Sequence, residues 1–181
     1  MIELSGAVLI GKGSERLCYQ HPENPDLCIK VRYRVKRSRN ESEREFDYAS
    51  SLKRGEAVPL ALPIEWVETN EGIGLICPLV RDDNGQLSQS LQNWSGKPQL
   101  AELFDEFAKS ILANHLSVTD LRMQNLVVQQ IADKARIVMI DGYGFTNDFL
   151  KYAFKVTRLI THIQTKRRLE KFRRNYIHDR Y

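Results

Sequence analysis

The sequence predicts an α+β protein built in two parts. Residues 1–80 contain short apolar runs separated by turns rich in Gly, Pro and Asn, which is typical of an antiparallel sheet. Residues 81–181 contain two long stretches with apolar residues at helical spacing. We therefore expect a five-strand antiparallel sheet with one helix, followed by a smaller, mainly helical part.

The first part is assigned from its apolar runs. A charged segment over residues 39–52 predicts the helix, because Phe46, Ala49 and Leu52 are spaced for a buried stripe and Gly55 is a suitable stop. Apolar runs between turns predict the five strands, at residues 7–10, 17–19, 27–32, 64–68 and 73–77.

The second part begins after a polar linker at residues 81–86. An amphipathic helix is expected after Pro98, a polar loop at 117–124, and paired strands at 126–128 and 136–140. From about Asn147 the sequence becomes helical again, with apolar residues on one side: Phe149, Phe154, Leu159, Ile160 and Ile163.

Composition narrows the class of protein. The chain of 181 residues is 42% hydrophobic and 28% charged, as in folded globular proteins. No apolar run approaches the ~20 residues of a membrane span, and the N-terminus lacks the pattern of a signal peptide, so we expect a cytoplasmic protein without a transmembrane segment. Three cysteines and four histidines show no disulfide framework and no metal-ligand spacing.

Charge is distributed unevenly along the chain. Residues 151–181 hold ten basic and two acidic side chains, a net +8, whereas the first 150 residues carry −4. Lys166-Arg167-Arg168 and Arg173-Arg174 are interleaved with Leu169, Phe172 and Tyr176. This pattern suggests an anionic partner of the basic C-terminal helix, either a nucleic acid or a membrane surface, although a solvated face would also explain it.

Three polar residues of the second part have the spacing of a phosphoryl-transfer site. Asp120 is followed by Asn125, and Asp141 comes directly after the apolar run Val138-Met139-Ile140. Transfer from ATP needs a carboxylate to orient or deprotonate the acceptor, and an amide and a second carboxylate to hold Mg²⁺. A buried carboxylate at a strand end also favours a divalent cation as partner.

Together with Gly11-x-Gly13 and Cys28-Ile29-Lys30-Val31, this order of motifs resembles the protein-kinase-like two-lobe fold over residues 7 to about 145. The resemblance implies that Gly11 and Gly13 cover the phosphates of ATP and that Lys30 binds them while pairing with a helix glutamate. Arg16 stands where the third glycine would be, and an ordinary hairpin turn would also explain the two glycines.

The resemblance assigns further residues to the nucleotide. Of Glu41, Glu43 and Glu45, the apolar residues that follow Glu45 make it our choice as partner of Lys30. Residues 76–80 resemble the hinge that bonds adenine, with the donor N–H on Leu79 or Val80, and residues 84–87 resemble the turn and helix start after it. Two cysteines, Cys18 and Cys28, are expected to line the base pocket, and Cys77 would gate its back, although an apolar strand end would also explain this residue.

In the second lobe the resemblance implies that Asp120 is the catalytic base and that Asn125 and Asp141 are magnesium ligands. Arg122 falls where kinases carry a lysine that contacts the transferred phosphoryl group. Val118-Thr119 replaces the usual His-Arg, which argues against control by activation-loop phosphorylation. Only 39 residues follow Gly142, so we expect a reduced lobe with little surface for docking a protein substrate.

More narrowly, three segments are similar to the YrbL family of PhoP regulatory network proteins: Leu17-Cys18-Tyr19-x-His21-Pro22, Cys28-Ile29-Lys30-Val31 and Asp120-Leu121-Arg122-x-x-Asn125. The hypothesis is an ATP- and Mg²⁺-dependent phosphotransferase acting on an unidentified acceptor. The alternative is a catalytically weak, pseudokinase-like regulator that binds nucleotide and signals by its shape.

Overall fold

The computed structural model describes residues 1–35, 41–52, 58–94, 99–144 and 154–177, with side chains from residue 159 in the last range. Two compact units are present. The first comprises Met1–Lys53 and Ala61–Leu79, and the second comprises Arg54–Leu60 and Val80–Tyr181.

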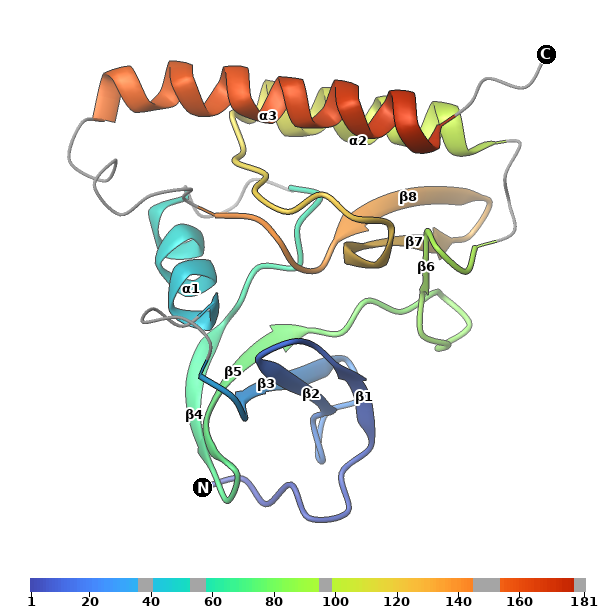
Figure 1. Ribbon diagram of the computed structural model, residues 1–181. Coiled ribbons are helices and arrows are strands. Elements are labelled where there is room, and N and C mark those ends of the chain that lie inside the picture. Colours follow the sequence, from blue (N-terminus) through green and yellow to red (C-terminus); the bar gives the residue numbers. More distant parts are fainter. Residues whose placement is uncertain (36–40, 53–57, 95–98, 145–153, 178–181) are drawn as a thin grey trace. The chain divides into compact units, whose positions relative to one another are not determined.

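The first unit is a five-strand antiparallel sheet with one helix (Figure 1). The strand order is β1-β2-β3-β5-β4, so the last hairpin joins the sheet through β5 beside β3. The expected five strands and helix are confirmed, with ends that differ by a few residues. The elements are β1 Leu9–Lys12, β2 Arg16–Gln20, β3 Leu27–Arg32, α1 Glu41–Ser51, β4 Glu65–Thr69 and β5 Gly72–Pro78.

The two faces of this sheet bury different side chains. Ile29 and Val31 of β3 pack with Leu4 and Ile76 on one face. Because successive residues of a strand point to opposite faces, Cys28 and Lys30 belong to the other face. There a second apolar cluster contains Cys28, Leu75 and Cys77, with Phe46 of α1 packed against it. The alternation in β3 therefore directs Lys30 to the face on which Phe46 packs.

Helix α1 buries polar side chains beside the apolar stripe expected from its sequence. The buried residues of α1 are Ser42, Glu45 and Tyr48, whereas Phe46 and Ala49 of the expected stripe are only partly buried. The expected stripe is only part of the inward side: Phe46 packs against the sheet, and the neighbouring polar side of the helix pairs with two buried cations of the sheet, on β2 and β3. Ion pairing and not apolar area alone thus sets the orientation of α1.

The second unit contains two long helices that lie side by side (Figure 1), α2 Leu100–Ala113 and α3 Phe154–Tyr176. Phe104 of α2 stacks on Phe172 of α3, with ring centroids 5.1 Å apart. The inward side of α3 is formed by Thr165, Leu169 and Phe172. The prediction that Leu159, Ile160 and Ile163 form the buried side of this helix is therefore wrong, since all three are exposed. Phe149 and the Phe154 side chain lie outside the described residues.

A three-strand sheet with order β6-β7-β8 completes this unit, from β6 Gln89–Ser90, β7 Leu126–Ile131 and β8 Lys134–Met139. The helix start expected at residues 84–87 is not formed. Instead Arg81 and Leu87 form a bridge, and the Asp82 carboxylate accepts hydrogen bonds from Ser88 Oγ and from the Gln130 N–H. These contacts hold the turn against β7, and the chain continues from it into strand β6.

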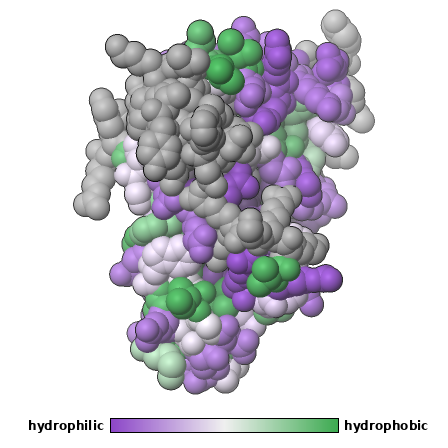
Figure 2. All heavy atoms as spheres, turned by 60° about the vertical axis from the view of Figure 1, so that its left-hand side comes forward, coloured by the Kyte–Doolittle hydropathy of each residue, from purple (hydrophilic) through white to green (hydrophobic). Residues whose placement is uncertain are grey.

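Where Figure 2 colours the surface, polar side chains surround separate patches of apolar ones. In the first unit, Val8 and Ile73 are among the exposed apolar residues. Among the residues that the structure describes, no helix has both the length and the apolar character needed to cross a membrane.

Candidate functional site

Lys30 and Glu45 form a buried ion pair between β3 and α1. Lys30 Nζ lies 3.1 Å from Glu45 Oε2, and both side chains are at most 10% exposed. Of the other two glutamates considered, Glu43 is exposed and Glu41 lies against Arg16. The structure thus brings together Lys30 and the glutamate that the sequence analysis chose.

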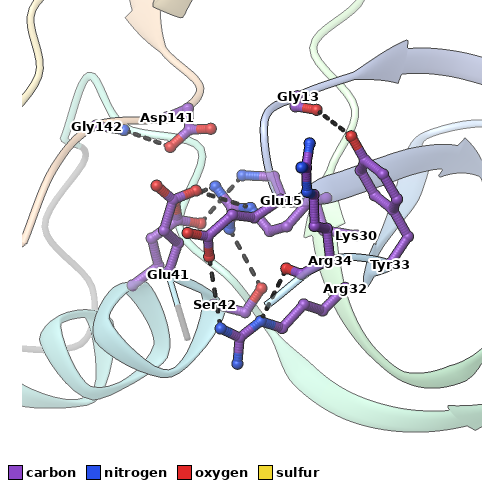
Figure 3. A network of polar contacts seen from close by, with 12 residues as sticks. Gly13, Glu15, Lys30, Arg32, Tyr33, Arg34, Glu41, Ser42, Asp141 and Gly142 are labelled. Carbon is purple, nitrogen blue, oxygen red and sulfur yellow. Dashed lines mark hydrogen bonds and ion pairs between the residues drawn. The ribbon is translucent and has the colours of Figure 1, made fainter. Parts of the chain in front are cut away.

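Gly11 lies within β1, where it pairs with Cys18 of β2, and Gly13 lies in the turn between these two strands. A Cβ at Gly11 would meet nothing within 4 Å, and one at Gly13 would only touch the Arg16 carbonyl, at 3.5 Å. The Gly13 N–H donates to this carbonyl, and Tyr33 Oη donates to the Gly13 carbonyl over 3.1 Å (Figure 3). The turn is closed by its own hydrogen bonds, and its packing does not demand glycine at either position.

The three cysteines share the sheet face of Lys30. Cys28 is the register partner of Cys77, and Cys18 is the register partner of Lys30. Hydrogen bonding with Cys18 is the main cause that raises the pKa of the Cys28 thiol, and a hydrogen bond with Cys28 lowers the pKa of the Cys77 thiol. All three are free thiols, and Cys28 and Cys77 are buried.

The two donors considered for adenine differ in their surroundings. The Leu79 N–H donates to the Asp26 carbonyl over 2.8 Å and is therefore engaged within the first unit. The Val80 carbonyl accepts from the Ser88 N–H. Of the two residues, the N–H of Val80 is thus the better candidate for a base contact.

Asp120 and Arg122 lie on the loop before β7. Arg122 Nε donates to Asp120 Oδ1 over 2.8 Å, and their side chains are 63% and 48% exposed, respectively. A carboxylate and a guanidinium on an exposed loop are available to a reactant from solvent. The pair itself is worth only about 0–1 kcal/mol at this exposure, so it can open at little cost.

Asn125 and Gly142 hold this loop in place. Asn125 Nδ2 donates to the Asp120 carbonyl over 2.9 Å, which anchors the amide and leaves its oxygen as an acceptor. The Gly142 carbonyl accepts from the N–H groups of Thr119 and Asp120 and from the Thr119 hydroxyl. Gly142 has φ +84°, and a Cβ there would collide with the Asp120 carbonyl. The Asp-Gly turn and the Asp120 loop are therefore one hydrogen-bonded structure.

Asp141 lies at the end of β8, and its Oδ1 accepts from the Gly142 N–H (Figure 3). Among the described residues, no group of three His, Cys, Asp or Glu side chains could hold a metal on its own. Mg²⁺ is commonly bound through one or two protein oxygens together with phosphates and water. Asp141 and Asn125 fit that manner of binding and do not form a complete metal cage.

Two buried charged residues had not been assigned a role from the sequence. Arg16 is 5% exposed and contacts α1, and Glu15 is 1% exposed, with its Oε2 3.6 Å from Arg32 Nη2 (Figure 3). Arg16 lies two residues before Cys18 in β2, so strand alternation places it on the face of Lys30. This register argument could have identified Arg16 in advance.

The basic segment is divided between internal and exposed side chains. Arg168 donates to the Val118 carbonyl over 2.7 Å, and Arg173 donates to both carboxylate oxygens of Asp105. Leu169 and Phe172 are buried and cannot stack on a ligand at the surface, which corrects their interpretation as part of a binding face. The exposed basic residues of the described part of α3 are Lys166, Arg167, Lys171 and Arg174.

The chain is similar to proteins of known family and to a solved kinase structure. The family described as PhoP regulatory network protein YrbL matches residues 2–177. Relatives from Escherichia coli (strain K12) and Shigella flexneri, both named Uncharacterized protein YrbL, are 29% identical over 155 residues, which is 80% of this chain and 74% of theirs.

Among solved structures, a doubly substituted PknI kinase domain from Mycobacterium tuberculosis matches with a TM-score of 0.51 and 16% identity. The match covers 75% of this chain and 57% of that domain, so the chain spans little more than half the length of this kinase domain. The likeness shows the fold, which is kinase-like. The chain belongs to the YrbL family of PhoP regulatory network proteins.

Proposed function

We propose that the chain binds ATP with Mg²⁺ and transfers a phosphoryl group to an acceptor that is still to be identified. The observation that carries the proposal is the buried Lys30–Glu45 pair, with 3.1 Å between Nζ and Oε2. A buried lysine held by a carboxylate is costly to desolvate, so its presence needs a further reason. Binding of the ATP phosphates by Lys30 supplies that reason.

The second unit contributes the remaining groups of the proposal. Asn125 and Asp141 would hold Mg²⁺, which when bound neutralises charge on the phosphates. Asp120 would orient the acceptor and take its proton, and Arg122 would contact the transferred group. Support comes from the hydrogen bonds that fix the Asp120 loop, Asn125 and the turn at Gly142 as one structure. In the first unit, Gly11, Gly13, Cys18, Cys28, Cys77 and the segment at Leu79 would surround the nucleotide.

The direct test is phosphate transfer or hydrolysis by Asp120→Asn compared with Asp133→Asn. Asp133 is an exposed carboxylate of the same unit in the turn between β7 and β8, so it controls for the loss of one charge. We expect Asp120→Asn to lose turnover while keeping MgATP affinity, and Asp133→Asn to keep both. Full turnover by Asp120→Asn would refute the catalytic role.

A second candidate function is regulation through nucleotide binding without turnover. It is favoured by the contact between Arg122 Nε and Asp120 Oδ1, because this hydrogen bond engages one of the two carboxylate oxygens that an acceptor hydroxyl could use. A thermal shift with MgATP, without hydrolysis or autophosphorylation, would select this function. Hydrolysis that Asp120→Asn abolishes would select the first.

An anionic partner of α3 is a separate proposal. Its support is the position of Arg167, Lys171 and Arg174, which are exposed and follow one stripe at i, i+4 and i+7. RNA that binds in a salt-sensitive manner fits such a stripe through its phosphates. We further propose that the protein acts in the cytoplasm, where ATP is available.

A further inference from the structure

Arg16 connects the start of β2 with the first turns of α1. Its guanidinium reaches three groups of the helix: Nη2 lies 2.8 Å from Glu45 Oε1, Nη1 lies 3.2 Å from Ser42 Oγ, and Nε lies 3.6 Å from Glu41 Oε2. Arg16 and Ser42 are buried, and Glu45 is 3% exposed. The contacts of Arg16 with Ser42 and Glu45 are therefore buried within the first unit, whereas the Glu41 side chain is 30% exposed.

The two oxygens of Glu45 are divided between two cations. Oε1 faces Arg16 and Oε2 faces Lys30. A buried carboxylate needs a charged partner, and the loss of its last partner would destabilise the site strongly. With two cations present, Glu45 remains paired when either one is withdrawn.

The two cations are not equivalent. Lys30 contacts Glu45 of α1 through its ammonium group, and the Arg16 guanidinium contacts three groups on one side of the same helix, on Glu41, Ser42 and Glu45. A guanidinium offers five donors in a rigid plane and stays charged at any relevant pH, while an ammonium is one flexible point charge. Arg16 thus has the geometry of a fixed connection, and Lys30 that of an exchangeable one.

We propose that Arg16 is a positioning residue that holds α1 on the sheet, so that Glu45 stays beside Lys30 whether or not a nucleotide is bound. In this arrangement Lys30 can turn to an anionic ligand without releasing the helix. The role of Lys30 toward phosphates rests on the proposed function, but the attachment of α1 by Arg16 does not.

Hydrogen exchange of the nucleotide-free protein tests whether Arg16, and not Lys30, holds α1 on the sheet. The variants are Arg16→Ala, Lys30→Met and, as a control for lost charge, Arg34→Ala, whose side chain is exposed in the same unit. We expect amides of α1 to exchange at least about tenfold faster in Arg16→Ala, and less than about twofold faster in the other two. Equal acceleration in Arg16→Ala and Lys30→Met, or none in Arg16→Ala, would overturn the proposal.

Amides of β4 and β5 serve as the internal reference for folding of the unit. If they also exchange faster in Arg16→Ala, the conservative Arg16→Lys decides, because lysine keeps a cation for Glu45 but cannot reach Ser42 and Glu41 together. Intermediate exchange in α1 with an unchanged sheet supports the proposal. Wild-type exchange in α1 of Arg16→Lys contradicts it.

Adding MgATP to the wild-type protein separates this inference from the proposed function. We expect α1 exchange to stay within about twofold of the nucleotide-free rate, because Arg16 keeps the helix in place. Faster exchange on binding would contradict the positioning role. If MgATP does not bind, the proposed function fails, but the comparison of exchange rates without nucleotide still tests the positioning role of Arg16.

Discussion

Gly142→Ala is expected to destabilise the second unit, because the residue combines a positive φ with a close backbone neighbour. At φ +84° a side chain costs about 1–2 kcal/mol relative to glycine. The new Cβ would also collide with the Asp120 carbonyl and lie 3.1 Å from Asn125 Nδ2. Relief of such overpacking typically costs about 1–3 kcal/mol. The expected loss is therefore about 2–5 kcal/mol.

Gly85→Ala is the matched control, since Gly85 has φ +79° but a Cβ there meets nothing within 4 Å. It should cost no more than the backbone strain of about 1–2 kcal/mol. Urea unfolding of both variants can be followed by fluorescence of Trp94, a residue of the second unit, after Trp66→Phe removes the signal of the first unit. Equal losses in the two variants would refute the argument that the Asp120 loop and the turn at Gly142 touch.

Three further predictions concern α3. The hydrogen bond from Arg173 lowers the pKa of Asp105, so its contribution is present above the usual carboxyl range and is lost as pH falls through the lowered pKa. Asp105→Asn should therefore reduce the thermal midpoint slightly at neutral pH and not at strongly acidic pH; the same reduction at both would contradict this. Phe172→Ala should cost about 3–5 kcal/mol in urea unfolding, because Phe172 is buried against Phe104, and a loss below about 1 kcal/mol would refute that packing. Salt-sensitive RNA binding, measured in a filter or polarisation assay, should disappear when alanine replaces the four exposed basic residues of α3, which are Lys166, Arg167, Lys171 and Arg174. RNA binding that persists in this variant would show that another surface is responsible.

The α+β class, the five strands of the first unit and the pair β7 and β8 could be predicted, because apolar runs bounded by turn residues indicate buried strands. The two polar residues of β6 carry no such pattern, and this strand was not predicted. The full set of polar contacts of α1 could not be predicted in the same way. Phe46 and Ala49 have the apolar spacing, but the buried side contains Ser42 and Glu45, whose partners are cations on β2 and β3. The spacing of apolar residues gives no information about such buried ion pairs.

In the candidate site, too, some contacts could be predicted from the sequence and others could not. Spacing and resemblance brought Lys30 and Glu45 together in advance, and the structure places them in contact. The positions of Asp120, Asn125 and Gly142 depend on backbone groups, since a carbonyl of one residue accepts the amide of another. A sequence shows side-chain types and not the direction of carbonyl groups, so these contacts require the structure.

Titration calorimetry with ATP, in the presence and absence of Mg²⁺, tests whether Lys30 binds the nucleotide and Asp141 its metal ion. Wild type, Lys30→Met and Asp141→Asn should be compared, with Asp133→Asn as the control for charge. We predict that ATP binds to wild type and to the control, that Lys30→Met weakens this binding, and that Asp141→Asn removes its dependence on Mg²⁺. No binding to wild type, or equal Mg²⁺-dependent binding to all four proteins, would contradict it.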